Sequence, residues 1–373
     1  MRTRLFWVAM ATAALVACGG GGGGGGGGNF GVLPIGGVPP APGPGAGPGP
    51  SPEPPPEPNP APTPTPVSAH YKFLTFKQDR DPGVDPPEKR YDDYIALLNR
   101  EGAAGYRYLD GLAGGNIVTL QDQFMMVKDT ETTYRYEYKR FEIDIQSSDG
   151  LPRLLQQMKE QGAKGMVFVK LLGVIDINAN NNGEFGVLYR KDAGSSATYD
   201  FTAADFPPAS ADLVNLANAQ GANGFRPWAA PVIRGLTQQF FIKDQSSPAR
   251  YQMKAVVSPL SVVGGEVKDV KAQIRDQGAA GYRLLKSRLM EDGKEFILYL
   301  KDTTQSSRFE YEFLENPDTV FGLQEANAVQ ANGQTAAGLR YFGLPDTPVF
   351  FRSLSCTGPL CVSPYGKEIE DGS

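Results

Sequence analysis

One short motif recurs along the chain at nearly constant spacing, and this repetition constrains the fold more than any other feature. Each clear copy holds two glycines three residues apart, followed by an aromatic or apolar residue. The first glycines of the clear copies are Gly102, Gly162, Gly221 and Gly278, which are 60, 59 and 57 residues apart. A weaker fifth copy covers residues 334–340. Such a period is typical of repeat proteins, in which similar units stack on their neighbours.

Every copy has the same succession of predicted elements. Apolar residues such as Leu151, Leu154 and Met158 precede the glycines at helical spacing. We expect the first glycine to end the helix in a left-handed conformation and the second to let the chain reverse closely into a strand. An apolar run ending in Lys-Asp follows and forms a hairpin with that strand, and an alternating strand such as 134–140 leads to the next helix. The predicted fold class is therefore α+β, with about five tandem β-α-β-β repeat units behind a disordered Gly/Pro-rich tether.

The repeat unit resembles a family of small bacterial domains of unknown function. That family's pattern is a helix ending in L-N-x-x-G-x-x-G-W, then a strand, then a strand that ends in an apolar run and a basic residue. The matching residues of the first copy are Leu98, Asn99, Gly102, Gly105 and Lys128. Tyr106 stands where the family has tryptophan. The resemblance implies the fold of one unit and no activity.

The N-terminus is typical of an exported protein. Two arginines precede an apolar stretch, residues 5–15, that is too short to span a bilayer. The stretch leads into Leu15-Val-Ala-Cys18, which resembles a bacterial lipobox. The resemblance implies cleavage before Cys18 and attachment of lipid to it. Because Gly19 rather than Asp follows, the resemblance also implies a lipid-anchored location in the outer membrane, on the periplasmic side or at the cell surface. The alternative is an ordinary signal peptide in which Cys18 has no role.

Residues 18–67 are predicted to be a disordered linker. Residues 19–67 hold 17 of the 45 glycines and 16 of the 31 prolines. The ten glycines 19–28 are expected to be flexible, and residues 39–66 to favour polyproline II, which at about 3.1 Å per residue would reach roughly 90 Å. We interpret the segment as a spacer; a docking site for a proline-binding module is the alternative.

The remaining chain divides into repeats, and its end carries two cysteines. We place the signal peptide at 1–17, the lipidated linker at 18–67, and the repeats at 68–139, 140–203, 204–257, 258–314 and 315–373, the last degenerate. Cys356 and Cys361 are the only cysteines besides Cys18. In an oxidising compartment this even number predicts a disulfide between them.

Four copies carry an arginine two residues after the second glycine: Arg107, Arg226, Arg283 and Arg340. Since neighbouring residues of a strand point to opposite faces, we expect the preceding aromatic or apolar residue inside and the arginine outside. Stacked units would then present a row of arginines to an acidic glycan or protein surface. The favoured alternative is a solvated strand face, and Val167 interrupts the row in the second copy.

Other conspicuous residues have ordinary structural interpretations. The glycine pairs close helices instead of opening them, which disfavours a phosphate loop. The recurring Lys-Asp pairs are interpreted as strand ends entering turns. The segment Asp176–Glu184 resembles a calcium loop slightly, but the twelfth position is Val187 when counted from Asp176 and Tyr189 when counted from Asn178, and neither can replace the glutamate of such a loop. We therefore favour a hairpin loop and leave ion binding by Asn178–Gly183 open. His70 is the single histidine, and no metal site, cofactor or catalytic group of residues is predicted.

These observations favour a non-catalytic body on a membrane anchor. The formal net charge of −5 argues against a nucleic-acid binder. We expect an envelope lipoprotein, partnered with the membrane through its lipid, whose repeats bind or scaffold an envelope glycan or protein. The alternatives are a glycan-acting envelope enzyme with a carboxylate pair, and a homotypic assembly module whose open sheet edges pair between molecules.

Overall fold

A computed structural model describes residues 68–77, 91–112, 121–141, 147–174, 184–230, 232–233, 236–315, 323–342 and 348–363. These residues belong to one compact unit. The predicted signal peptide, Cys18 and the linker lie outside the described residues.

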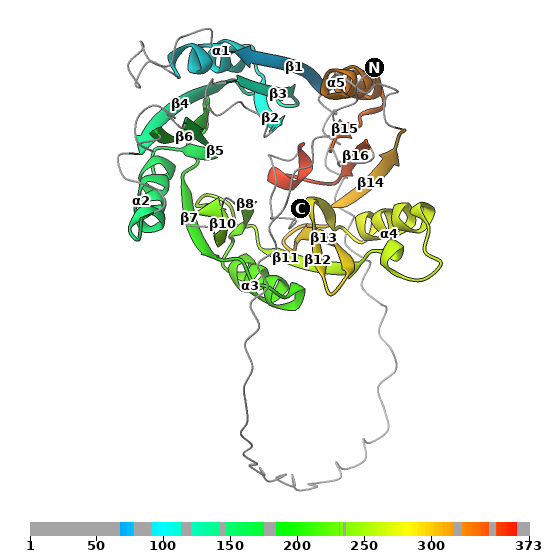
Figure 1. The fold of residues 1–373 in the computed structure, drawn as a ribbon. Helices are drawn as coiled ribbons and strands as arrows, with labels where there is room; N and C mark the ends of the chain where they lie inside the picture. Colours follow the sequence, from blue (N-terminus) through cyan, green and yellow to red (C-terminus); the bar gives the residue numbers. More distant parts are fainter. Residues whose placement is uncertain are drawn as a thin grey trace, which may run out of the picture. The chain divides into compact units, whose positions relative to one another are not determined.

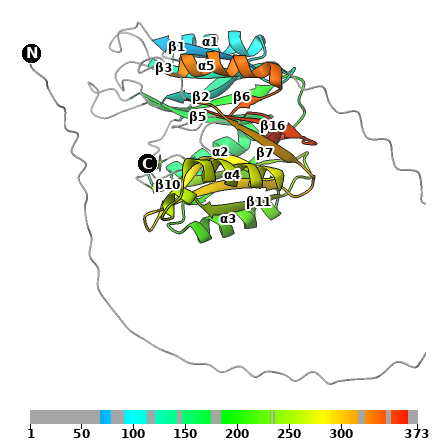
Figure 2. The same cartoon turned by 90° about the vertical axis from the view of Figure 1, so that its right-hand side faces the viewer.

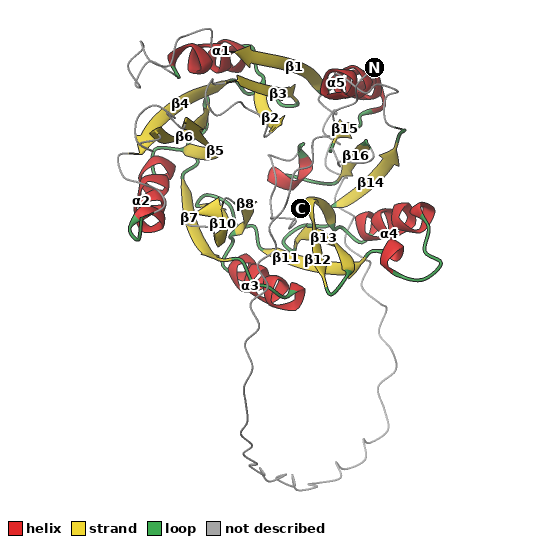
Figure 3. Cartoon of the chain, viewed as in Figure 1, coloured by secondary structure: helices red, strands yellow, loops and turns green. Residues whose placement is uncertain are grey.

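Five small antiparallel sheets, each with a helix, make up the fold, which confirms the predicted α+β repeat architecture (Figures 1 and 3). Unit 1 comprises β1 (His70–Lys77), α1 (Asp92–Ala103), β2 (Arg107–Leu112) and β3 (Gln121–Lys128). Unit 2 comprises β4 (Tyr134–Phe141), α2 (Gly150–Gly162), β5 (Met166–Val174) and β6 (Glu184–Asp192). Unit 3 comprises β7 (Tyr199–Asp205), α3 (Ser210–Ala222), β8 (Arg226–Ala229), the short β9 (Val232–Ile233) and β10 (Leu236–Asp244).

The last two units follow the same plan. Unit 4 comprises β11 (Tyr251–Val257), η2 (Pro259–Ser261), α4 (Val267–Ala279), β12 (Arg283–Glu291) and β13 (Lys294–Asp302). Unit 5 comprises β14 (Arg308–Phe313), α5 (Leu323–Gln334), η3 (Thr335–Ala337), β15 (Arg340–Tyr341), β16 (Val349–Leu354) and η4 (Pro359–Cys361). In every sheet the last long strand is central, as in the order β1-β3-β2.

The strand pairing moves the unit boundaries. We predicted the second repeat to begin at residue 140, but β4 begins at Tyr134 and pairs with β6. The strand that follows each Lys-Asp turn therefore belongs to the next sheet.

Each helix packs on the first strand of the following unit: α1 on β4, α2 on β7, α3 on β11 and α4 on β14. The helix of unit 5 then packs on the first strand of unit 1, and α5 and β1 lie side by side in both views (Figures 1 and 2). The five units thus form a closed ring of contacts, which we call the ring.

Both faces of a sheet are buried in this arrangement. In β3, Phe124 and Met126 pack with α1 and β4, whereas Met125 and Val127 pack with α5 and unit 5. These four side chains are 0–4% exposed. A strand buried on both sides needs a continuous apolar run rather than an alternating one, which explains the Phe-Met-Met-Val sequence.

The predicted role of the first glycine of the motif is wrong, whereas the second glycine reverses the chain as predicted. The second glycine has the left-handed conformation, with φ of 90° at Gly105 and 72–86° at its counterparts. The first, Gly102, is helical, and a Cβ there would collide with the carbonyl oxygen of Tyr134 in the next unit. Three further first glycines meet β7, β11 and β14 in the same way. The first glycine therefore lets the helix approach its neighbouring unit, and the second reverses the chain.

An asparagine in the helix fastens successive units. The Asn99 side chain accepts from Tyr136 N (2.7 Å) and donates to Tyr136 O (3.1 Å). Asn218 holds Met253 of β11 in the same way, and Asn332 of α5 holds Tyr71 of β1. We call this pair of hydrogen bonds the asparagine clamp; one clamp closes the ring.

Candidate functional site

The predicted outward position of the arginines is wrong. Arg107 is 0%, Arg283 1% and Arg226 8% exposed, and Arg340 is partly buried. The physical reason is that both faces of each sheet are covered by neighbouring units, so these sheets have no outward face at this position. Their suggested role in binding a partner stays a prediction.

The arginines lie in the same cross-strand row of their sheets. In unit 2 the arginine of this row comes from the central strand instead of an edge strand. Three directly opposed residues cross each sheet; in unit 1 they are Tyr71, Val127 and Arg107. In unit 2 they are Tyr136, Arg190 and Val167. The apolar residue and the arginine have exchanged strands, and Arg190 is 3% exposed like its counterparts. The interruption at Val167 is thus compensated, and every sheet has one arginine in this row.

The arginine of unit 1 forms a fully buried ion pair. Arg107 donates from Nε to Asp129 Oδ1 (3.0 Å) and from Nη2 to Asp129 Oδ2 (2.7 Å), and both side chains are 0% exposed. Asp129 is the aspartate of the Lys-Asp turn. The recurring aspartate therefore serves as a partner for the buried arginine in unit 1, in addition to its expected place at the turn.

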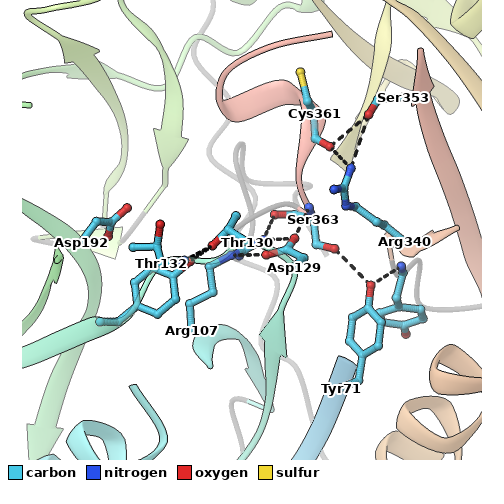
Figure 4. Close-up of polar contacts among 12 residues, drawn as sticks. Tyr71, Arg107, Asp129, Thr130, Thr132, Asp192, Arg340, Ser353, Cys361 and Ser363 are labelled. Atoms are coloured by element: carbon cyan, nitrogen blue, oxygen red, sulfur yellow. Dashed lines mark hydrogen bonds and ion pairs between the residues drawn. The ribbon is translucent and has the colours of Figure 1, made fainter. Parts of the chain in front are cut away.

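The chain's own C-terminal segment meets this pair (Figure 4). Arg107 Nη2 donates to Ser363 O (2.7 Å), and Ser363 N donates to Asp129 Oδ2 (3.0 Å). The hydroxyl of Tyr71 accepts from Tyr341 N (2.7 Å) and lies 3.2 Å from Ser363 Oγ. Unit 1 therefore binds both backbone groups of a residue located 234 positions beyond Asp129.

The same segment is also fixed to units 4 and 5. Arg340 Nη1 donates to Cys361 O (2.5 Å), and the Ser353 hydroxyl donates to the same oxygen (3.2 Å). Gln305 of unit 4 exchanges hydrogen bonds with the backbone of Thr357. We call residues 355–363 the strap, because they join the last two units to the first; the strap is red in Figure 1.

The predicted disulfide is present in the strap, between Cys356 and Cys361. It closes the loop that precedes Ser363, and Leu360 within the loop is buried. The disulfide therefore belongs to the segment that meets Arg107 and Asp129.

The ionisation of these groups follows from their surroundings. Burial opposes charge on Asp129, but the charge and hydrogen bonds of Arg107 and the backbone N–H of Ser363 bring its pKa below the usual value. Burial raises the pKa of Tyr71 far above its usual value. At neutral pH the site therefore combines a carboxylate, a guanidinium and a neutral phenol, and all three contact Ser363.

Units 2 to 4 hold related charges. Arg190 Nε donates to Asp192 Oδ1 (2.7 Å), although Asp192 is 26% exposed. In unit 3, the Arg226 guanidinium lies 4.6 Å from the Trp228 ring centroid. Burial raises the pKa of Tyr251. The charges of Asp302 and Asp244 raise it further, and those of Arg226 and Arg283 oppose the increase. Charges of units 3 and 4 therefore both act on Tyr251, the first residue of β11.

A separate surface groove of about 460 Å³ lies between α2 and β7. It is mostly apolar, with Leu155, Phe201 and Ala203 among its lining residues and Lys159 and Glu160 at its polar positions. In the residues that the structure describes, no group of three or more His, Cys, Asp or Glu could hold a metal ion. No described helix is long and apolar enough to cross a membrane.

Two sequence predictions lie outside the described residues: Cys18, and the loop Asn178–Gly183. Sequence reasoning missed Arg190, Ser363 and Tyr71. Arg190 could have been found by asking which residue faces Val167 across the hairpin, whereas nothing local marks Ser363 as a partner of Asp129.

Comparison with known proteins adds no relative: the chain matches no protein-family model, no curated protein and no solved structure.

Proposed function

We propose that this protein is a lipid-anchored lipoprotein of the bacterial outer membrane, whose repeat body binds or scaffolds an envelope component without catalysis. The observation that carries the proposal is the sequence Leu15-Val-Ala-Cys18 behind a short apolar stretch. Lipid on Cys18 would hold the body beside the membrane, because several acyl chains anchor a protein where one does not.

The architecture supports the binding part of the proposal. Five similar units repeat their outer surfaces around one body, and repeated modest contacts add through effective concentration. The buried charges hold units and strap together, so we look for partner contacts on the outer surfaces, including the groove between α2 and β7. The partner would be an envelope glycan or protein.

The anchor is tested with Cys18→Ala in the full chain, expressed in a double-membrane bacterium. We expect the variant to lose fatty-acid labelling and to leave the outer-membrane fraction. The double variant Cys356→Ser/Cys361→Ser is the matched control, because it removes cysteines but keeps Cys18, and it should remain labelled. A parent chain without label, or a Cys18→Ala variant that fractionates with the parent, would contradict the anchor.

The binding part is tested by sedimenting the unlipidated Cys18→Ala chain with purified envelope glycan. We expect saturable co-sedimentation and no release of soluble sugar. Released fragments would favour the glycan-acting enzyme instead. A chain that stays in the supernatant would exclude glycan as the partner and leave the protein partner to be tested by crosslinking at the cell envelope.

A further inference from the structure

The exposed aliphatic side chains of the body are concentrated in unit 4. Among the described residues, seven large hydrophobic side chains are exposed. Five of them belong to unit 4: Leu260 (49%), Val262 (59%), Val263 (105%), Val267 (54%) and Met290 (56%). We call the segment 259–267 together with Met290 the apolar tip. Scattered exposed aliphatic residues are ordinary, but such a concentration marks an interaction surface.

The tip is a built structure. Ser258 N donates to Glu295 O (2.7 Å), and Glu295 N donates to Ser261 Oγ (2.7 Å), so η2 is fastened to the start of β13. Glu266 and Asp269 form a capping box at the start of α4. Gly264 has φ of 82°, and a Cβ at Gly265 would collide with the carbonyl oxygen of Pro259. The backbone therefore holds Val262 and Val263 out in the solvent.

We propose that the apolar tip inserts into the surface of the lipid bilayer to which Cys18 is anchored. The inference rests on the proposed anchor. The 50 residues from Cys18 to Val67 span at most about 170 Å when fully extended, so an anchored body stays within that distance of the bilayer. At this effective concentration, weak insertion of a few aliphatic side chains is enough to orient the body.

The size of the tip favours lipid over a second copy of the chain. A stable protein–protein interface uses about 20–30 residues on each side. The tip offers five aliphatic side chains, and the most exposed one stands at its outer turn beside two glycines. So small an apolar surface suits a fluid partner, which needs no complementary shape.

The charged residues around the tip include no excess of positive charge, because the acidic ones outnumber the basic ones: Glu266, Asp269, Glu291, Asp292 and Glu295 against Lys268, Lys271 and Lys294. Glu266 and Lys268 are exposed and form an ion pair of 2.9 Å, and Asp292 and Lys294 flank the hairpin beside Met290. This surface therefore has no net attraction to anionic lipid headgroups. Insertion should depend on the apolar side chains and little on salt or headgroup charge.

The test uses the mature chain, residues 18–373, with Cys18→Ala, so that neither the apolar stretch 5–15 nor an acyl group contributes to binding. In separate proteins, Val263→Cys and Val329→Cys are labelled with an environment-sensitive fluorophore. Val329 of α5 is the matched control, because it is 69% exposed and lies outside the tip. With phosphatidylcholine vesicles, we expect a blue shift at position 263 and none at 329, and the same result with anionic vesicles.

A second measurement uses vesicle flotation without labels. Val262→Asp/Val263→Asp should reduce vesicle binding at least about tenfold, because two inserted aliphatic side chains become charged, while Val329→Asp should leave it unchanged. The inference is overturned if the label at 263 does not shift, if the double aspartate variant floats like its parent, or if the shift follows protein concentration without vesicles, which would indicate self-association.

The two proposals fail separately. If Cys18 is acylated in the parent chain but the apolar tip does not bind vesicles, only the proposed insertion of the tip is rejected. Binding by the tip in a chain whose Cys18 carries no lipid rejects only the anchor.

Discussion

The junction between units 1 and 2 and the junction between units 5 and 1 are built alike but secured differently. Both have an asparagine clamp, from Asn99 to Tyr136 and from Asn332 to Tyr71. Both have a tyrosine hydroxyl that accepts a backbone N–H of the preceding unit, from Tyr108 to Tyr136 and from Tyr341 to Tyr71. The first junction joins units that are continuous in sequence, whereas the second joins the two ends of the body.

The junction between units 5 and 1 lacks the first glycine of the motif and has the strap in addition. Thr335 stands where the first glycine of the motif would be, and α5 continues into the 3-10 helix η3. The strap is added, and it bonds to Arg107, Asp129 and Tyr71 of unit 1. Units 1 and 2 are linked by the chain and need only the contacts of the repeat. Units 5 and 1 are not linked by the chain in this way, and the strap adds further contacts between them.

The sharpest test compares the removal of Asp129, which the strap contacts, with the removal of Asp192, its counterpart in unit 2. Asp129→Ala leaves the fully buried Arg107 without its carboxylate and Ser363 N without its acceptor, so we expect a loss of about 3–5 kcal/mol in the free energy of unfolding. Asp192→Ala removes a partner that is 26% exposed, and water can replace it, so about 1 kcal/mol is expected. Urea unfolding of both variants measures the difference. Equal losses would show that the strap does not make the closing junction special.

A smaller effect is expected from the clamps. Asn332→Ala deprives Tyr71 of two backbone hydrogen bonds, which should cost about 1–3 kcal/mol. Asn99→Ala removes the equivalent bonds from Tyr136, where sequence continuity keeps the partners close. Hydrogen exchange should therefore show faster exchange in β1 of the first variant than in β4 of the second. The reverse order would mean that the strap alone closes the ring.

The disulfide should have an effect within the range expected for one clamp. Cys356→Ser/Cys361→Ser opens a loop with a sequence separation of five residues, and so short a loop restricts the unfolded chain little, by about 2 kcal/mol. Reduction of the parent chain should shift its urea midpoint by the same amount as the double variant. A much larger shift would show that the disulfide positions Ser363 for Asp129 rather than only restricting the unfolded chain.

The sequence was sufficient to predict the elements of one unit because their signals are local. Helical spacing at Leu154 and Met158, the glycine pairs and the cysteine pair all act within a few residues. The side on which Arg107 lies could not be read in the same way, because alternation along a strand indicates two faces and not what covers each of them. The continuous apolar run in β3 contained that information, since burial of every residue requires cover on both faces.

The closing contacts were beyond prediction for a different reason. The bonds between Asp129 and Ser363 and between Tyr71 and Asn332 join residues more than 230 positions apart, and neither pair has a spacing that the repeat dictates. Each follows from the number of units that complete the ring, which is a property of the whole body.

The packing of each helix on the strand of the next unit has a consequence for how such a gene can change. In an open array, duplicating or deleting one repeat alters the length and leaves the ends as they were. Here, loss of one repeat would change the angle through which every remaining unit must turn before α5 meets β1. Substitutions within a repeat, such as the paired exchange of valine and arginine between the strands of unit 2, alter one sheet, whereas a change in repeat number would need all the junctions to adjust together.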